Sequence, residues 1–173
     1  SGWWERQVPS DHDWDAALSV NLRGTVTVSD VVVPHMIDRR SGKIVNIASV
    51  AARRGGKDMP QYYASKAAVL SLTQSLATRL APYEINVNAI CPGLLWTPMW
   101  EAIAKARIRG DYEPEWEGLS GREAFNKAVK AWIPLGREQT PEDVGKLAAF
   151  LVSDDATNIT GQAVNLDGGR YMN

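Results

Sequence analysis

Residues 43–97 decide the fold, and they read KIVNIASVAARRGGKDMPQYYASKAAVLSLTQSLATRLAPYEINVNAICPGLLWT. The stretch opens with a near-continuous apolar run, residues 43–48, and a second apolar run follows at residues 85–91. Such short runs are typical of strands that are covered on both faces. The segment between them is rich in small residues, and its Pro60 suits a first helical turn, so we predict a helix over residues 60–81. Strand, helix and strand in this order form a βαβ unit, which binds ligands at the carboxyl ends of its strands.

Tyr62 and Lys66 lie in the predicted helix, four residues apart. Two side chains at that spacing share one helix face and lie one turn apart. An ammonium close to a phenol favours the phenolate and lowers the pKa of tyrosine from about 10 toward neutral pH, which suits proton transfer. An exposed tyrosine and lysine on a solvated face is the alternative. Ser49 and Pro92-Gly93 follow the two apolar runs, so we expect all of these residues at one edge of the sheet.

Several short motifs occur along the chain in the order found in one enzyme family. They are Asn21 within Val20-Asn21-Leu22-Arg23-Gly24-Thr25, Asn46-Ile47-Ala48-Ser49, Tyr62-Tyr63-Ala64-Ser65-Lys66, Asn88-Ala89-Ile90-Cys91-Pro92-Gly93, Thr97 and Asp167-Gly168-Gly169. With these motifs the chain resembles the C-terminal part of a classical short-chain dehydrogenase/reductase. The resemblance implies an α/β fold, the C-terminal part of a doubly wound Rossmann-type parallel sheet with flanking helices. It also implies that residues 1–173 are the catalytic part of a single domain, with residues 97–137 inserted as a lid over the substrate.

The same resemblance implies hydride transfer between NAD or NADP and a small alcohol or carbonyl substrate. Tyr62 is then the general acid or base, and Lys66 lowers the pKa of Tyr62 and binds the nicotinamide ribose. Ser49 bonds the substrate oxygen, and Asn21 holds a water that relays protons from Lys66. The expected catalytic residues are therefore Asn21, Ser49, Tyr62 and Lys66. The expected cofactor-binding residues are Tyr62, Lys66, Pro92, Gly93, Leu95 and Thr97.

A Gly-rich turn between a strand and a helix normally holds the cofactor pyrophosphate in this family. No such turn occurs in the sequence, since Gly55-Gly56 is a lone pair in a loop and Gly168-Gly169 is a terminal turn. By comparison with the family, residue 1 falls just after the fourth strand. We therefore expect a fragment, or one piece of a split protein, that lacks the adenosine-binding half. A catalytically inactive fragment or scaffold subunit is the alternative function. The choice between NAD and NADP, and the substrate, stay open.

Composition excludes several other classes. The chain is 45% hydrophobic and 23% charged, which is ordinary for a soluble globular protein. Its net charge of −1 gives no electrostatic reason to expect nucleic acid or an anionic membrane as a partner. No apolar run approaches the roughly 18 residues of a membrane span, and no signal-peptide pattern is present, so a cytoplasmic setting is the default.

Two other kinds of chemistry are not supported. The serine-hydrolase motif G-x-S-x-G is absent, and His12 and His35 lack metal-ligand spacing, so we expect no metal site. The single cysteine, Cys91, lies in an apolar run and is expected to be buried rather than nucleophilic.

The N-terminal third holds the least certain secondary structure. Ser10 followed by acidic residues is a helix start. Residues 25–33 are rich in β-branched side chains and favour a strand, and Pro34 disfavours a helix. The resemblance nevertheless implies one helix to Arg39-Arg40 with a bend at Asn21.

Three segments keep two interpretations each. Arg53 and Arg54 either face an anionic substrate or are merely solvated. Residues 98–136 form either a lid or two amphipathic helices that complete the core. Trp3 and Trp4 either line the substrate cleft or are simply exposed.

The remaining elements are a helix that begins at Thr140-Pro141 and a strand over residues 163–166. In the family the counterpart of the 60–81 helix packs against its copy in a neighbouring subunit, which implies a homodimer or homotetramer.

Overall fold

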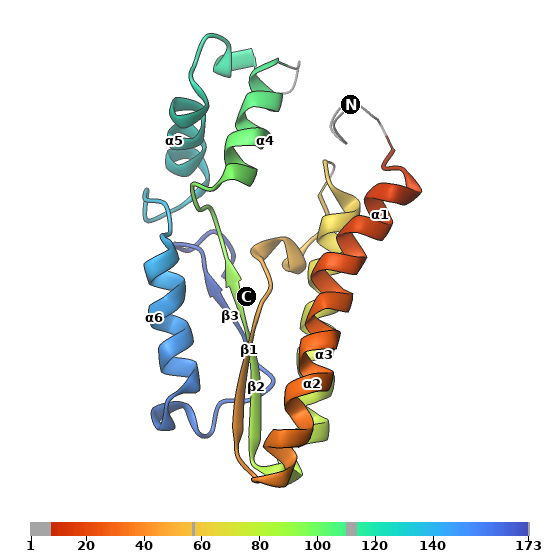
Figure 1. Ribbon diagram of the computed structural model, residues 1–173. Coiled ribbons are helices and arrows are strands. Elements are labelled where there is room, and N and C mark those ends of the chain that lie inside the picture. The colour runs from red at the N-terminus through yellow and green to blue at the C-terminus, as the bar shows by residue number, and fades with distance from the viewer. Residues whose placement is uncertain (1–7, 57, 110–113, 173) are drawn as a thin grey trace.

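A parallel three-stranded sheet with helices on both faces forms the centre of the molecule (Figure 1). The computed structural model describes residues 8–56, 58–109 and 114–172, so Trp3 and Trp4 lie outside the described residues. The strands are β1 (Gly42–Ile47), β2 (Ile85–Pro92) and β3 (Ala163–Leu166), in the order β1-β2-β3. The helices are α1 (Asp11–Leu18), α2 (Gly24–Asp38), α3 (Pro60–Leu80), α4 (Pro98–Arg109), α5 (Gly121–Trp132) and α6 (Pro141–Val152). Helices α1, α2 and α3 lie on one face, α6 on the other, and α4 and α5 beyond the carboxyl ends of the strands.

The strand register brings three chain segments to one edge of the sheet. Ile47 at the end of β1 pairs with Ile90, and Pro92 at the end of β2 pairs with Leu166 at the end of β3. The predicted strands and the predicted βαβ unit are confirmed. Because all three strands are parallel, the residues that follow them emerge side by side.

The N-terminal helix is continuous despite its strand-like composition. Helices α1 and α2 are joined by a π-helical turn, Ser19–Arg23, which contains Asn21. The predicted helix is therefore confirmed, and the π-helical turn lies where we expected a bend. The tendency of residues 25–33 to form a strand is overridden by packing, since Val33, Met36 and Ile37 cover the core at Leu80 and Ile85. The hydroxyl of Thr25 donates to the Asn21 carbonyl at 2.8 Å, which satisfies a backbone acceptor at the π turn.

Helix α3 packs one mostly apolar face against the sheet. Val69, Ala77 and Leu80 of α3 are almost fully buried against β2 residues such as Val87 and Ala89. A buried polar contact reinforces this packing, because the Asn46 amide donates to the Thr73 hydroxyl at 2.9 Å. That hydroxyl donates in turn to the Val69 carbonyl at 2.8 Å, so the buried polar groups are paired.

Helices α4 and α5 pack on each other with an aromatic core of their own. Phe125 is fully buried, and the ring centroids of Trp96 and Trp100 each lie 5.2 Å from its centroid. Trp116 is 2% exposed in a second small cluster with residues of both helices. The two interpretations of residues 98–136 are thus compatible: the segment is a helical hairpin with buried aromatics, and it stands over the carboxyl edge of the sheet (Figure 1).

Other expectations concern caps, spans and metals. Thr140 begins α6 with reciprocal bonds to Asp143, as predicted. No helix in the described part of the chain is long and apolar enough to cross a membrane. The described residues hold no group of three or more His, Cys, Asp or Glu side chains arranged to bind a metal.

The turn after β2 depends on a glycine. A Cβ at Gly93 would lie 2.5 Å from Oε1 of Gln139 and 2.9 Å from Cα of Asp167. The Gln139 oxygen cannot move freely, because it is buried and accepts from the Leu94 amide at 2.8 Å. Gly93 itself donates to the Leu166 carbonyl at 3.0 Å. The close approach of three segments therefore requires residue 93 to lack a side chain.

Replacing Gly93 with alanine should destabilise the protein by about 1–3 kcal/mol through overpacking. The matched control is Gly145→Ala in α6, where no atom lies within 4 Å of the added Cβ. That change should stabilise the helix by about 0.5–1 kcal/mol. Chemical denaturation of the complete protein measures both. Equal effects of the two changes would contradict the packing described at Gly93.

Candidate functional site

Tyr62 and Ser49 meet at the carboxyl edge of the sheet. Ser49 follows β1 and begins a short 3-10 turn, Val50–Arg53, with its hydroxyl accepting from the Ala51 amide at 3.1 Å. Tyr62 lies in the first turn of α3, where its amide donates to the Met59 carbonyl. The Ser49 side chain hydrogen-bonds the Tyr62 phenol. The predicted convergence of these two residues is present.

Burial rather than a neighbouring charge controls the Tyr62 phenol. Desolvation raises its pKa above the ordinary value of 10.0, and the hydrogen bond from Ser49 lowers the pKa by a smaller amount. The nearby Tyr63 raises it further. We predicted that Lys66 lowers the pKa of Tyr62, but Lys66 is not among the causes of the shift in this structure. The pKa is raised instead, because the cost of burying the phenolate exceeds the stabilisation from Ser49. The phenol is therefore held protonated at neutral pH.

Lys66 is tied to the end of β1. Its ammonium donates to the Ile47 carbonyl at 3.0 Å and lies 5.9 Å from the centroid of the Tyr62 ring. Burial lowers the pKa of Lys66, and the nearby Cys91 opposes this shift. The i,i+4 spacing on α3 thus places the two side chains together as expected, but the ammonium faces the strand carbonyl and the ring rather than acting on the phenol pKa.

Asn21 braces the π turn against α3. Its amide donates to the Ser65 hydroxyl at 2.9 Å, and that hydroxyl donates to the Tyr62 carbonyl at 2.8 Å. Asn21 therefore connects to Tyr62 through Ser65, which fixes the first turns of α3. Its hydrogen bonds to described residues include none to Lys66, so its water-holding role stays a prediction.

The predicted cofactor-binding residues follow β2 on the same edge. Pro92 is the last residue of β2, whereas Gly93, Leu95 and Thr97 belong to the connection to α4. All four are partly buried. The Thr97 carbonyl accepts from the Glu101 amide at 2.9 Å, and its hydroxyl accepts from the Trp100 amide at 3.4 Å. Thr97 thus begins α4 as well as facing this edge.

Two residues from the C-terminal half hold the edge together. Gln139, which sequence reasoning missed, bonds Leu94 through both its backbone and its side chain. No local pattern signals this contact, since 45 residues separate the two. Asp167, known only as part of a motif, accepts from the amides of Gly169 at 3.0 Å and Tyr171 at 2.8 Å. It thereby shapes the C-terminal turn.

Cys91 and Arg53 contribute to the packing around the site. Cys91 is fully buried, as predicted, and burial raises the pKa of its thiol, which keeps it protonated. Arg53 donates to the side chain of Asn165 at 2.9 Å and to the Ala163 carbonyl. Arg53 is partly buried and therefore fastens the 3-10 turn to β3.

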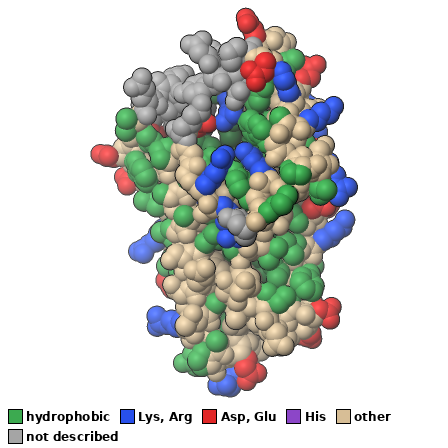
Figure 2. Space-filling model, turned by 180° about the vertical axis from the view of Figure 1, so that it is seen from behind, with side chains coloured by type: hydrophobic (Ala, Val, Ile, Leu, Met, Phe, Trp, Pro, Cys, Tyr) green, Lys and Arg blue, Asp and Glu red, His purple; other side chains and the backbone are tan. Residues whose placement is uncertain are grey.

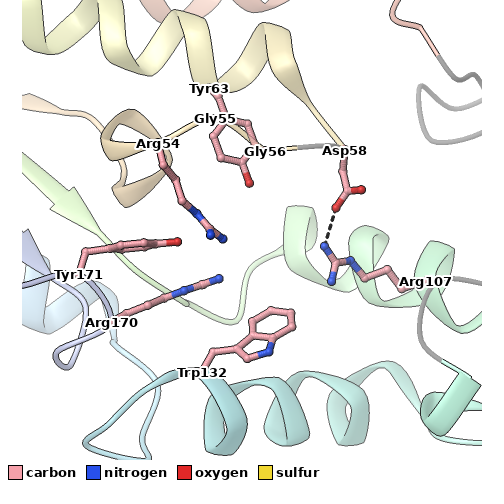
Figure 3. A pocket seen from close by; sticks show the side chains of 9 residues that line it. All are labelled: Arg54, Gly55, Gly56, Asp58, Tyr63, Arg107, Trp132, Arg170 and Tyr171. Carbon is pink, nitrogen blue, oxygen red and sulfur yellow. Dashed lines mark hydrogen bonds and ion pairs between the residues drawn. The ribbon is translucent and has the colours of Figure 1, made fainter.

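A cavity of about 640 Å³ opens beside this edge (Figure 3). Its walls come from the loop after β1, α3, α4, α5 and the C-terminal segment. They are Arg54, Gly55, Gly56, Asp58, Tyr63, Arg107, Trp132, Arg170 and Tyr171. Gly56 packs directly on the Tyr63 ring, where a Cβ would lie 2.2 Å from a ring atom. The cavity therefore adjoins the residue next to Tyr62.

Proteins of known family are similar to this chain in sequence. A family model described as enoyl-(acyl carrier protein) reductase matches residues 7–170. The 3-oxoacyl-[acyl-carrier-protein] reductase FabG of Thermotoga maritima is 38% identical over 159 residues, covering 92% of this chain and 57% of the relative. Galactitol 2-dehydrogenase of Agrobacterium fabrum is 40% identical over 164 residues, covering 94% and 61%.

Solved structures of similar proteins have the same fold as this chain. An actinorhodin polyketide ketoreductase crystallised with NADPH superimposes with a TM-score of 0.81 at 36% identity, covering 94% of this chain and 60% of that one. An NAD⁺-bound xylitol dehydrogenase gives a TM-score of 0.82 at 31% identity, covering 94% and 62%. The chain spans about three fifths of the length of these relatives. Matching motifs, strand order and relatives together mean that this chain belongs to the short-chain dehydrogenase/reductase family.

Proposed function

We propose that this chain carries the catalytic residues of an NAD- or NADP-dependent oxidoreductase that interconverts an alcohol and a carbonyl, with Tyr62 as general acid or base. The partly buried Tyr62 phenol, whose pKa is lowered by the Ser49 side chain and whose ring lies next to Lys66, carries the proposal. Relatives include both a ketone reductase and sugar-alcohol dehydrogenases, so the proposal leaves direction and substrate open.

The residues present fit a nicotinamide cofactor on the β2 side of the edge. Gly93 has no side chain in the turn after β2, and the Lys66 ammonium, at the neighbouring end of β1, donates to a single backbone carbonyl among the described residues. Pro92, Gly93, Leu95 and Thr97 would hold the nicotinamide end, and Lys66 would bind its ribose. The cofactor supplies or accepts the hydride.

The chain's own task is to handle the proton and position the substrate. Ser49 donates a hydrogen bond to the substrate oxygen and orients it toward Tyr62. In reduction, Tyr62 donates its phenolic proton to the forming alkoxide, and its raised pKa keeps that proton in place at neutral pH. In oxidation the phenol must first lose the proton, which requires positive charge beside it. Lys66 supplies this once its ammonium turns from the Ile47 carbonyl.

A second candidate is a catalytically inactive fragment or scaffold subunit. The sequence lacks a Gly-rich phosphate turn, and β1 has only one strand neighbour in the described part of the chain. Titration of this chain with NADH and with NADPH, followed by fluorescence, separates the two candidates. Binding of either favours the oxidoreductase, and binding of neither favours the inactive fragment for this polypeptide.

We also propose that the protein is a homo-oligomer that associates through α3. The solvent-facing side of α3 carries small residues, among them Ala64, Ala67 and Ser71, which permit close helix approach. The neighbouring α2 exposes Val28 and Val31 at 63% and 64%. Small and apolar side chains together on one exposed surface suit packing against a second copy.

Tyr62→Phe in the complete protein should lower kcat by about 10²–10⁴-fold, because the phenolic proton is lost while the ring remains. The affinity for NADH or NADPH should stay nearly the same. Tyr83→Phe, at an exposed position after α3, is the matched control and should leave kcat unchanged. Steady-state kinetics with fluorescence titration measures both quantities. Full activity of the Tyr62 variant would contradict the assigned role.

Without cofactor, the Tyr62 phenol should ionise at a higher pH than an ordinary tyrosine, because its pKa is raised by burial. The folded state then binds the proton more tightly than the unfolded state, so this residue makes the free energy of unfolding fall as pH rises above about 10. Ultraviolet titration of tyrosinate should show a late step that Tyr62→Phe removes.

Lys66→Met should leave that late step in place, because Lys66 does not contribute to the shift. A change of about one pH unit or more on removing Lys66 would instead show direct charge coupling in the cofactor-free protein.

Ala67→Arg should shift the complete protein toward the monomer, since a long charged side chain blocks close approach of two α3 helices. Ala102→Arg, at an exposed position on α4, is the control and should leave the assembly intact. Light scattering gives the molar mass of each. An unchanged mass for the Ala67 variant would rule out association through this face.

A further inference from the structure

The cavity beside Tyr63 is strongly cationic. Among the described residues, three arginines and a single carboxylate, Asp58, line it. Asp58 is occupied, because its Oδ2 accepts from Nη2 of Arg107 at 2.7 Å in a largely buried ion pair. The lining therefore carries two positive charges in excess. Figure 2 shows Lys and Arg side chains gathered in the upper half of one face of the molecule, with few acidic side chains among them.

Arg54 and Arg170 hold the excess charge. Neither forms an ion pair with a described residue. Arg54 belongs to the loop after β1 and Arg170 to the C-terminal segment, yet both extend into the same space (Figure 3). Two guanidinium groups directed into one cavity repel each other, and an anion between them would relieve that repulsion.

Aromatic rings hold these guanidinium groups in place. The Arg54 guanidinium carbon lies 5.3 Å from the ring centroid of Tyr171, and that of Arg170 lies 5.0 Å from the centroid of Trp132 and 5.5 Å from that of Tyr171. A guanidinium on a ring face keeps its N–H donors available at its edge. Those donors suit the paired oxygens of a phosphate or carboxylate.

We propose that this cavity is an anion subsite in which Arg54 and Arg170 bind a phosphate or carboxylate group of the substrate. The proposal rests on the proposed function, because it assigns the far end of the substrate whose carbonyl or alcohol reacts at Tyr62. Tyr63, which lines the cavity, directly follows Tyr62, and the two ring centroids are 6.4 Å apart. A substrate that reacts at Tyr62 and extends past the Tyr63 ring would reach the cavity. The substrate is a hydroxy or oxo compound with a phosphate or carboxylate at its other end.

The first test measures binding without turnover. Glycerol 3-phosphate and succinate are titrated into the complete protein by calorimetry, with glycerol as the neutral match. Both anions should bind, more weakly as ionic strength rises, and glycerol should not. The two anions also distinguish phosphate from carboxylate preference. Absence of binding by both anions would overturn the proposal.

Variants assign the binding to the two arginines. Arg54→Gln and Arg170→Gln should each weaken binding of the preferred anion by about tenfold or more, since each loses a charged donor fork. Arg54→Lys keeps the positive charge but loses the paired N–H donors of the guanidinium, so its affinity should lie between those of the unaltered protein and Arg54→Gln. Arg39→Gln, at an exposed position at the opposite end of the sheet, should bind as the unaltered protein does. Circular dichroism confirms that each variant is folded. Unchanged binding by the Arg54→Gln/Arg170→Gln double variant would overturn the proposal.

A kinetic test separates this proposal from the proposed function. Dihydroxyacetone phosphate is compared with dihydroxyacetone, and acetoacetate with ethyl acetoacetate. A higher kcat/KM for the anionic members, lost in the two Gln variants mainly through KM, is expected. Equal use of the neutral members would overturn the subsite. NADH and NADPH affinities should not change in these variants. Anion binding without any nicotinamide binding would contradict the proposed function and leave the cavity assignment standing.

Discussion

The parallel register of three strands is the constraint on which the site depends. Because β1, β2 and β3 end at the same edge, Ser49, Gly93 and Asp167 emerge next to one another from distant parts of the chain. Gly93 allows the closest approach, and Gln139 and Asp167 fix the turns on either side by hydrogen bonds to backbone amides. The edge is thus rigid before any ligand is considered, as a preorganised site requires.

At that edge, burial and hydrogen bonding act on the Tyr62 phenol in opposite directions, and burial has the larger effect. This outcome suits a proton donor, since the phenol keeps its proton at neutral pH. Lys66 is held by the Ile47 carbonyl at the end of β1, and under the proposed function a ribose hydroxyl of the cofactor would replace this contact. The acid–base character of the pair therefore depends on what occupies the site as well as on the spacing of the two residues.

The helical hairpin and the C-terminal segment supply part of the lining of the cavity beside the site. The hairpin packs its aromatic rings between α4 and α5, and Trp132 at the end of α5 contacts Arg170 on one side of the cavity (Figure 3). Under the proposed function, the transfer of hydride and proton needs only the edge of the sheet. We propose that selection among substrates falls to the residues that line the adjoining cavity, which come from the loop after β1, from α3, α4 and α5, and from the C-terminal segment.

The sequence by itself determined the βαβ unit, the start of α6 at Thr140, the burial of Cys91 and the pairing of Tyr62 with Lys66, because each follows from local periodicity, capping or i,i+4 spacing. The helix over residues 25–33 was predictable only through resemblance, since packing on the sheet overrides its β-branched composition. Tertiary structure alone decided the direction of the Tyr62 pKa shift, the contact of Gln139 with Leu94, and the different positions of Arg53 and Arg54. The physical reason is that burial and contacts between residues distant in sequence arise only when the strands and helices pack, and no local pattern encodes them.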